Sequence, residues 1–152
     1  MRGHPSLARI FVCLAAAGLA AAIAIAQSQA LGDITVEVTN IRNEKGEVLI
    51  SLYNRADGFP RDRNAIFRSA VVPAESGSVS TVFEGLPHGE YAVAVLHDED
   101  ASLDMTFGFL NLPKEGYCFS NNVKVKLKAP SFEKVKFALD GDTVTQTLRM
   151  RY

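Results

Sequence analysis

The densest group of side chains able to do chemistry is the acidic segment His97-Asp98-Glu99-Asp100-Ala101-Ser102-Leu103-Asp104. Hard oxygen ligands at alternate positions of a loop are how a calcium-binding loop begins. We therefore take Asp98, Asp100 and Asp104 as candidate ligands of a divalent cation, with calcium as the expected ion. The segment departs from the full calcium-loop pattern, because Leu103 stands where a turn glycine is needed and the twelfth position is a phenylalanine.

Two other interpretations of this segment stay open. The first is a solvated acidic loop at the end of a strand, without a ligand. The second is a hydrolase that uses Ser120, His97 and Asp98. The sequence gives this second interpretation little support, because Ser120 lacks the Gly-x-Ser-x-Gly turn that exposes a nucleophile. Adjacent His97 and Asp98 also point in different directions on an extended chain.

The expected long loop from residue 97 to 122 is the candidate contact surface. Its aromatic and apolar residues between 107 and 119 predict an ordered loop with its own small core, because long unstructured loops are uncommon in compact domains. Polar side chains near both ends of the loop could contact a partner or bond to the main chain. The candidate contact residues are His97, Glu115, Tyr117, Ser120, Asn121 and Asn122.

A basic stretch follows this loop and has two interpretations. Its members are Lys124, Lys126, Lys128, Lys134 and Lys136. Lysines at alternate positions protect an edge strand from pairing with another chain. The same lysines could instead contact an anionic surface, such as a membrane face or a polysaccharide.

The elements that must position these residues are short strands. Alternating or continuous apolar runs, separated by turn residues, indicate about seven of them. This pattern predicts an all-β domain over residues 33–152, folded as a single immunoglobulin-like or transthyretin-like sandwich. Segments that carry this pattern lie near residues 34–39, 47–53, 67–72, 78–83, 90–96, 123–128, 133–139 and 143–152.

The first 26 residues predict a cleaved signal peptide. Two arginines precede an apolar run that ends in Ala24-Ile25-Ala26, and a second possible cleavage sequence ends at residue 30. The alternative is a retained membrane anchor, for which the run is short and rich in alanine. We therefore expect export to the periplasm or the cell exterior, with no transmembrane segment after processing.

Charge and cysteine content narrow the function further. Cleavage after residue 26 leaves 14 Lys and Arg against 17 Asp and Glu, a net charge of −3. A dedicated nucleic-acid binder would carry a basic excess, so we expect no nucleic-acid partner. Cys118 is then the sole cysteine, which predicts a buried thiol and no internal disulfide.

Several short motifs resemble one bacterial family. Leu86-Pro87-His88-Gly89-Glu90-Tyr91 is similar to a turn-and-strand of transthyretin-like and carboxypeptidase-regulatory-like sandwiches. His97-Asp98-Glu99, Pro113 to Tyr117, Phe119 to Asn122 and Pro130 to Glu133 resemble the exported family catalogued as domain of unknown function 2141. The resemblance covers essentially residues 34–152 and implies a secreted β-sandwich without an established activity.

The chain departs from this family inside the acidic segment. The family's typical loop runs H-D-E-N-G-N-G-x-L-D, whereas Ala101 and Leu103 stand here at the two glycine positions. Cys118 replaces a further glycine. We therefore expect first a non-enzymatic exported module that binds an envelope or extracellular partner and uses no cofactor. A calcium-dependent structural module is the alternative, and a hydrolase comes third.

Overall fold

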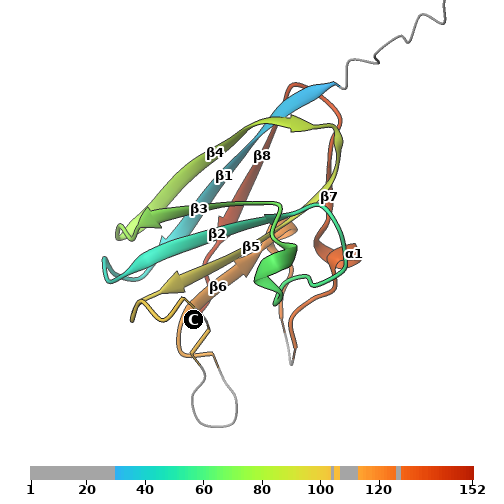
Figure 1. Ribbon diagram of the computed structural model, residues 1–152. Helices are drawn as coiled ribbons and strands as arrows, with labels where there is room; N and C mark the ends of the chain where they lie inside the picture. Colours follow the sequence, from blue (N-terminus) through green and yellow to red (C-terminus); the bar gives the residue numbers. More distant parts are fainter. Residues whose placement is uncertain (1–29, 104, 107–112, 126–127) are drawn as a thin grey trace, which may run out of the picture.

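The computed structural model describes residues 30–103, 105–106, 113–125 and 128–152. These residues form two β-sheets that pack face to face (Figure 1). One sheet has the strand order β4-β1-β8, and the other has the order β3-β2-β5-β6 with β7 paired to β5. The strands are β1 (Leu31–Ile41), β2 (Glu47–Tyr53), β3 (Arg68–Pro73), β4 (Gly77–Pro87), β5 (Gly89–Asp98), β6 (Gly116–Phe119), β7 (Phe137–Leu139) and β8 (Thr143–Arg149). The expected all-β sandwich is thereby confirmed.

Helical structure is confined to three short pieces in the described part of the chain: the 3-10 turns η1 (Arg63–Ala65) and η3 (Ser120–Asn122), and the single-turn helix α1 (Phe132–Val135). Among the described residues, no helix is long and apolar enough to cross a membrane.

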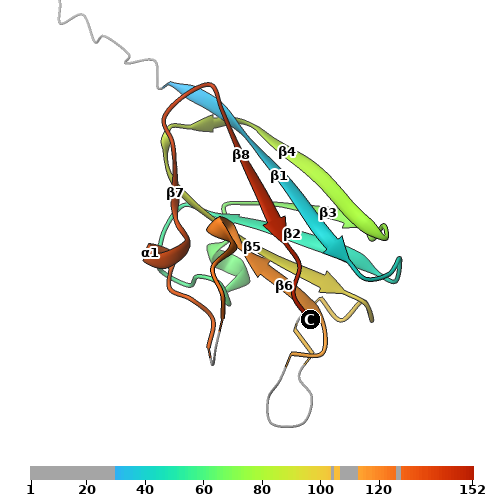
Figure 2. The same cartoon turned by 180° about the vertical axis from the view of Figure 1, so that it is seen from behind.

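Strand β1 shows why the sequence forms this sandwich. Ile34, Val36 and Val38 are fully buried, whereas the residues between them face outward, as their alternation predicts. β1 pairs antiparallel with β4 on one side and parallel with β8 on the other. Strands from both ends of the chain therefore lie side by side, which both views of the fold show (Figures 1 and 2).

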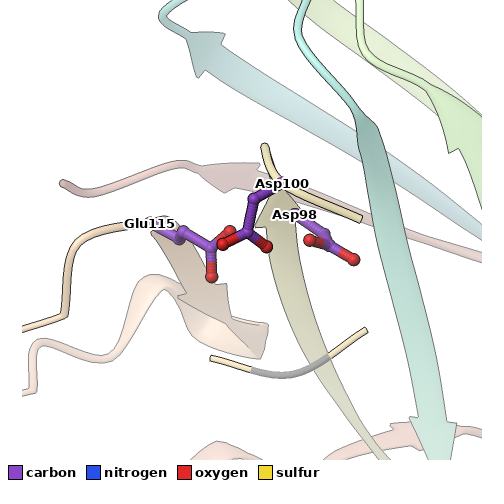
Figure 3. A group of neighbouring side chains, drawn as sticks. All are labelled: Asp98, Asp100 and Glu115. Carbon is purple, nitrogen blue, oxygen red and sulfur yellow. The ribbon is translucent and has the colours of Figure 1, made fainter. Parts of the chain in front are cut away.

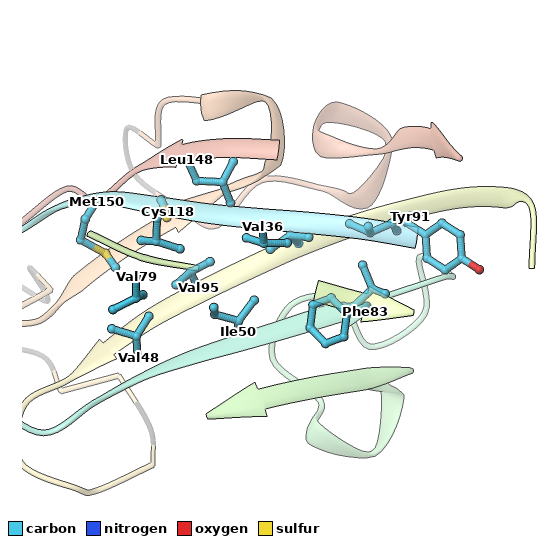
Figure 4. Close-up of a cluster of buried hydrophobic side chains, with 14 of the residues drawn as sticks. Val36, Val48, Ile50, Val79, Phe83, Tyr91, Val95, Cys118, Leu148 and Met150 are labelled. Atoms are coloured by element: carbon cyan, nitrogen blue, oxygen red, sulfur yellow. The ribbon is translucent and has the colours of Figure 1, made fainter. Parts of the chain in front are cut away.

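The main core lies between the two sheets. Inward residues of β2 and β5, such as Ile50 and Val95, face Val36 and Leu148 of the other sheet (Figure 4). Close packing of this kind supplies most of the stabilisation of a sandwich.

A second apolar cluster covers part of the outer face of the five-stranded sheet. Phe59, in the segment between β2 and β3, packs edge-on against Tyr53 with ring centroids 5.0 Å apart. It also contacts Phe119 at 6.1 Å and Phe132 of α1 at 5.9 Å. β5 is thus covered on both faces over this part, because Ala92 belongs to the second cluster while its neighbour Val93 belongs to the main core.

The structure corrects the expected loop from residue 97 to 122. β5 continues through His97 and Asp98, because these residues pair with Val48 and Glu47 of β2. β6 then pairs antiparallel with β5. The region is therefore the end of one strand, a connection, a second strand and η3. Residues 107–112, which include Phe109 and most of the expected apolar core of the loop, lie outside the described residues, whereas Tyr117 and Phe119 of that expected core lie in β6.

Two expected strands near the C-terminus are also corrected. Residues 123–125 and 128 form no strand, and residues 126–127 lie outside the described part. Val123 and Val125 pack against the second cluster, and this packing, rather than strand pairing, accounts for their alternation with lysines. The expected strand 133–139 is instead α1 followed by β7. Phe132 and Val135, three residues apart, are both buried on one side of this turn.

Candidate functional site

Three carboxylates meet where β5 ends and β6 begins. One oxygen from each of Asp98, Asp100 and Glu115 lies within 4.8 Å of the other two. Asp98 and Glu115 are buried, with 0% and 3% of their surface exposed, whereas Asp100 is exposed. Figure 3 shows the Asp100 carboxylate between the other two. Such a group of oxygens could hold a divalent cation.

The strand register explains how Glu115 joins the two aspartates. Leu96 lies opposite Tyr117 and His97 opposite Gly116, so the next position along the same antiparallel register places Asp98 across from Glu115. Sequence reasoning predicted Asp98 and Asp100 as ligands and treated Glu115 only as a contact residue. The third predicted ligand, Asp104, lies outside the described residues.

The carboxylates of Asp98 and Asp100 already accept several hydrogen bonds from the residues that follow them in the chain. Asp98 accepts hydrogen bonds from the amides of Ser102 at 3.1 Å and Leu103 at 2.7 Å. Asp100 accepts one from the Ser102 amide at 3.1 Å and one from the Thr106 hydroxyl at 3.2 Å. Hydrogen bonds from Ser102 hold the pKa of Asp100 below its ordinary value.

Glu115 closes the same connection from the other side. Its two oxygens accept the amides of Glu99 at 3.0 Å and Thr106 at 2.9 Å. The Lys114 amide donates to the Thr106 carbonyl at 2.9 Å, so a main-chain bond also joins the segment that follows β5 to the segment that precedes β6. The carboxylates therefore satisfy amides that no strand partner reaches, and they fix the shape of the connection.

His97 is fully buried and has a structural role. Its Nε2 lies 2.8 Å from the carbonyl of Lys45, and its Nδ1 lies 2.8 Å from the hydroxyl of Tyr152. Because a carbonyl can only accept, Nε2 carries a proton, and in the neutral imidazole Nδ1 accepts from the Tyr152 hydroxyl. The Tyr152 hydroxyl in turn accepts the amide of Arg42 at 3.0 Å.

Arg42 extends this network to the acidic segment. Its Nε donates to Glu99 at 2.6 Å, and its guanidinium lies 4.3 Å from the centre of the Tyr152 ring. The hydrogen bond from Arg42 holds the pKa of Glu99 below its ordinary value. Sequence reasoning missed Arg42, Lys45 and Tyr152, because they are distant from His97 and Glu99 in sequence and join this network only in the folded domain.

Ser120, Asn121 and Asn122 also hold the fold together. Ser120 is fully buried; its Oγ donates to the Val135 carbonyl at 2.6 Å and accepts the Val93 amide at 2.9 Å. With His97 engaged by Lys45 and Tyr152, no Ser–His–Asp hydrogen-bond chain forms among the described residues.

The two asparagines connect η3 to the following segments. Asn121 donates to the carbonyls of Val135 at 3.0 Å and Lys136 at 2.9 Å. Asn122 donates to the Thr147 carbonyl and accepts the Arg149 amide, at 2.8 and 2.7 Å. Both asparagines have φ near 60°, at 60° and 53°, a conformation that asparagine tolerates better than most residues.

The comparison with family models decides what this chain is similar to. A model described as "Uncharacterized protein conserved in bacteria (DUF2141)" matches residues 36–147. The chain belongs to this family. A search of curated proteins finds no match, and a search of solved structures finds none. The transthyretin-like relationship therefore stays a prediction.

The backbone is strained at Ala101 and Leu103, two positions at which this DUF2141 chain departs from the typical loop expected for the family. Ala101 has φ 57° and Leu103 has φ 62°, in the left-handed region where glycine has no steric cost. The loop thus keeps a shape suited to glycine although neither residue is glycine. The third departure, Cys118, is buried at 2% exposure as expected, and burial raises its pKa to about 12.

Exposed apolar side chains mark the same end of this DUF2141 domain. Leu103 is 45% exposed and Tyr152 is 40% exposed, although both are held by the hydrogen bonds described above. Tyr117 is half-buried and bridges the chain end through two main-chain bonds with Arg151, at 2.8 and 3.0 Å. Of the predicted contact residues, His97, Glu115 and Ser120 are buried, whereas Asn121 and Asn122 are exposed.

Proposed function

We propose that this protein is an exported, non-enzymatic β-sandwich that acts as a binding or accessory module in the periplasm or outside the cell. Its contact surface is the loop end, which we define as residues 99–103, 105–106 and 113–115 together with Tyr152. The observation that carries the proposal is Leu103: a bulky apolar residue held at φ 62° with 45% of its surface exposed. Backbone strain of this kind concentrates where function requires it.

The loop end is rigid enough to bind without a large entropic cost. Asp98 and Glu115 are buried anchors, and each accepts two main-chain amides of the connection. A surface that is already ordered loses less conformational freedom on binding than a mobile one. The anchors therefore support recognition by the exposed Leu103 and Tyr152.

The compartment rests on the first 26 residues. A basic start, an apolar run and the small-x-small sequence Ala24-Ile25-Ala26 support cleavage and export. N-terminal sequencing of protein recovered from the cell envelope is expected to give Gln27 or Leu31 as the first residue. Recovery of a membrane-embedded species that starts at Met1 would contradict export by cleavage.

A photo-crosslinking experiment tests the contact surface. A photoreactive amino acid replaces Leu103 in one variant and Val82 on β4 in the matched control, since these side chains are 45% and 49% exposed. We expect a discrete adduct in the producing cells from position 103 alone. Identical adduct patterns from both positions, or none from position 103, would contradict a contact surface at the loop end.

A calcium-stabilised structural module is the second candidate. The observation in its favour is the approach of Asp98, Asp100 and Glu115 oxygens to within 4.8 Å, with two of the three carboxylates buried. A cation would relieve their mutual repulsion. Calcium at about one hundred times its Kd would stabilise the native state by about 2.7 kcal/mol.

Thermal melting with calcium and with a chelator tests this second candidate. If calcium binds, the Tm of the wild type and of the control Asp57→Asn should be higher in calcium than in chelator. The Tm of Glu115→Gln should be the same in both. An identical Tm for the wild type in calcium and in chelator would exclude a calcium site of useful affinity.

A further inference from the structure

A second surface lies on the outer face of the five-stranded sheet. It is built from residues 54–66, between β2 and β3, and from residues 123–125 and 128–136, which include α1; we call these segments the basic cap. Phe59 of the first segment packs against Phe132 of the second with ring centroids 5.9 Å apart. Segments about 70 residues apart in the sequence are thus held together, and both views place them on one side of the sheet (Figures 1 and 2).

The basic cap has the opposite charge to the rest of the domain. Its described residues include seven Lys and Arg and three Asp and Glu, a net charge of +4. The other described residues include six Lys and Arg and thirteen Asp and Glu, a net charge of −7. The domain therefore has a strong charge asymmetry that its overall charge hides.

Most cations of the basic cap have no acidic partner. Lys136 is paired with Glu90 at 3.0 Å and with Glu133 at 2.7 Å. The Asp62 carboxylate is engaged at the start of η1, where it accepts the Asn64 amide at 2.9 Å. Within the described part of the chain, six cations form no ion pair: Arg55, Arg61, Arg63, Lys124, Lys128 and Lys134.

An open groove runs between the two segments of the basic cap. Residues 58–62 form one wall and residues 128–131 form the other. Arg61 and Lys128 lie on opposite walls and are exposed, while Phe59, Pro60 and Pro130 contribute apolar surface. Asp62 also lines the first wall, where its carboxylate accepts the Asn64 amide. The groove therefore combines one cation on each side and one engaged carboxylate with an apolar lining.

We propose that this groove binds a chain of an anionic polysaccharide. A carboxylate on such a chain matches the planar fork of Arg61, and Lys128 provides a point charge on the opposite wall. The C–H faces of sugar rings can bury apolar area against the groove lining. This surface is separate from the loop end, so the proposal does not depend on the function proposed above.

A water-soluble glycan fits the basic cap better than a lipid bilayer. Peripheral membrane binding combines basic residues with exposed apolar side chains that enter the bilayer. The large apolar residues that are exposed in the described part of the chain all lie outside the basic cap: Leu31, Val71, Val82, Leu103 and Tyr152. A concave surface also suits a chain better than a flat membrane face.

Calorimetric titration of the purified protein with polygalacturonate, a carboxylate-bearing glycan, tests the proposal. The variant Arg61→Gln/Lys128→Gln removes one cation from each wall. Lys45→Gln/Arg68→Gln is the matched control, because it also removes one lysine and one arginine, both exposed and outside the basic cap. All four side chains are exposed, and thermal melts confirm that both variants fold. We expect the first variant to bind about tenfold more weakly and the control to bind like the wild type.

Four outcomes would overturn the proposal. Equal loss of affinity in both variants would mean that only the overall charge matters. Binding of neutral dextran as tight as that of polygalacturonate would remove the role of the cations, as would an affinity that does not fall between about 50 and 500 mM salt. Binding to phosphatidylglycerol vesicles without binding to polygalacturonate would assign the basic cap to a membrane instead.

Discussion

The hydroxyl of Tyr152, the last residue of the chain, lies 2.8 Å from Nδ1 of the fully buried His97. The other nitrogen of His97 contacts the Lys45 carbonyl in the turn between β1 and β2. One imidazole therefore joins β5, a hairpin turn and the C-terminus. This junction lies beside the acidic connection, because Arg42 contacts both Tyr152 and Glu99.

We predict that Tyr152→Phe lowers the free energy of unfolding by about 1–3 kcal/mol, because it leaves the buried Nδ1 of His97 without a donor. Urea denaturation measures the change. Tyr117→Phe is the control, since no described residue forms a hydrogen bond with the Tyr117 hydroxyl, and it should change stability by less than about 0.5 kcal/mol. Equal effects of the two substitutions would contradict a special role for the Tyr152 hydroxyl.

The Arg42–Glu99 pair predicts a defined pH dependence. The folded-state pKa of Glu99 lies below its unfolded value, because Arg42 donates a hydrogen bond to the carboxylate. The resulting stabilisation, about 0.5–1 kcal/mol for a partly exposed pair, is complete above the unfolded pKa of about 4.3. It is lost as the pH falls through the lower folded-state pKa.

Urea denaturation of wild type and Glu99→Gln between about pH 3 and pH 7 measures this contribution. The difference in unfolding free energy should be constant near neutrality and should shrink below about pH 4.3. Glu44→Gln, in the exposed turn after β1, controls for the loss of one charge. A wild-type advantage over Glu99→Gln that grows in acid would show that the sign of the pKa shift is wrong.

Leu103→Gly should stabilise the domain by about 0.5–1 kcal/mol, although glycine usually destabilises. Its φ of 62° costs a leucine about 1–2 kcal/mol, which exceeds the entropic cost of glycine. Leu31→Gly, at an exposed leucine of β1, should destabilise instead. Chemical denaturation of both variants decides the matter. Destabilisation of equal size in both would mean that the backbone at Leu103 carries no strain.

Cys118 should react with thiol reagents at least about a hundredfold more slowly in the native protein than in denaturant. The reactive species is the thiolate, and the pKa of Cys118 is raised to about 12 by burial. The measurement uses a chain with Cys13→Ser. An added Ser80→Cys on exposed β4 is the positive control. Native labelling of Cys118 as fast as that of the thiol added on β4 would contradict burial.

The strands predicted well are those whose own residues show a clear apolar pattern. β2 begins and ends at the expected residues, 47 and 53, and β1 contains the expected alternation of Ile34, Val36 and Val38. β6 has only four residues, and its short apolar run Tyr117-Cys118-Phe119 follows the turn-type residues Pro113, Lys114, Glu115 and Gly116. Such a strand becomes visible only through its register with β5.

The candidate site was predictable to the extent that it is local in sequence. Asp98 and Asp100 stand two residues apart, so the sequence alone brings them together. Glu115 joins them through the β5–β6 pairing, and Tyr152 reaches His97 through folding of the whole domain. The basic cap has the same origin: its lysines are visible in the sequence, but Phe59 and Phe132 must pack together before Arg61 and Lys128 line one groove.

The pairing of β1 with β8 also affects the order in which the strands can pair during folding. Asp33 lies beside Thr143 and Thr39 beside Arg149, so β1 can gain this neighbour only after residues 143–149 have been made. The amide of Met150 bonds to the Thr39 carbonyl and the Tyr152 hydroxyl contacts His97, so residues 150 and 152 also make contacts with residues far earlier in the sequence. A ribosome makes the N-terminus first, and contacts this distant in sequence form slowly. The β1–β8 pairing is therefore expected to form late, after the pairing of β1 with β4 and of β2 with β5, whose strands are made earlier.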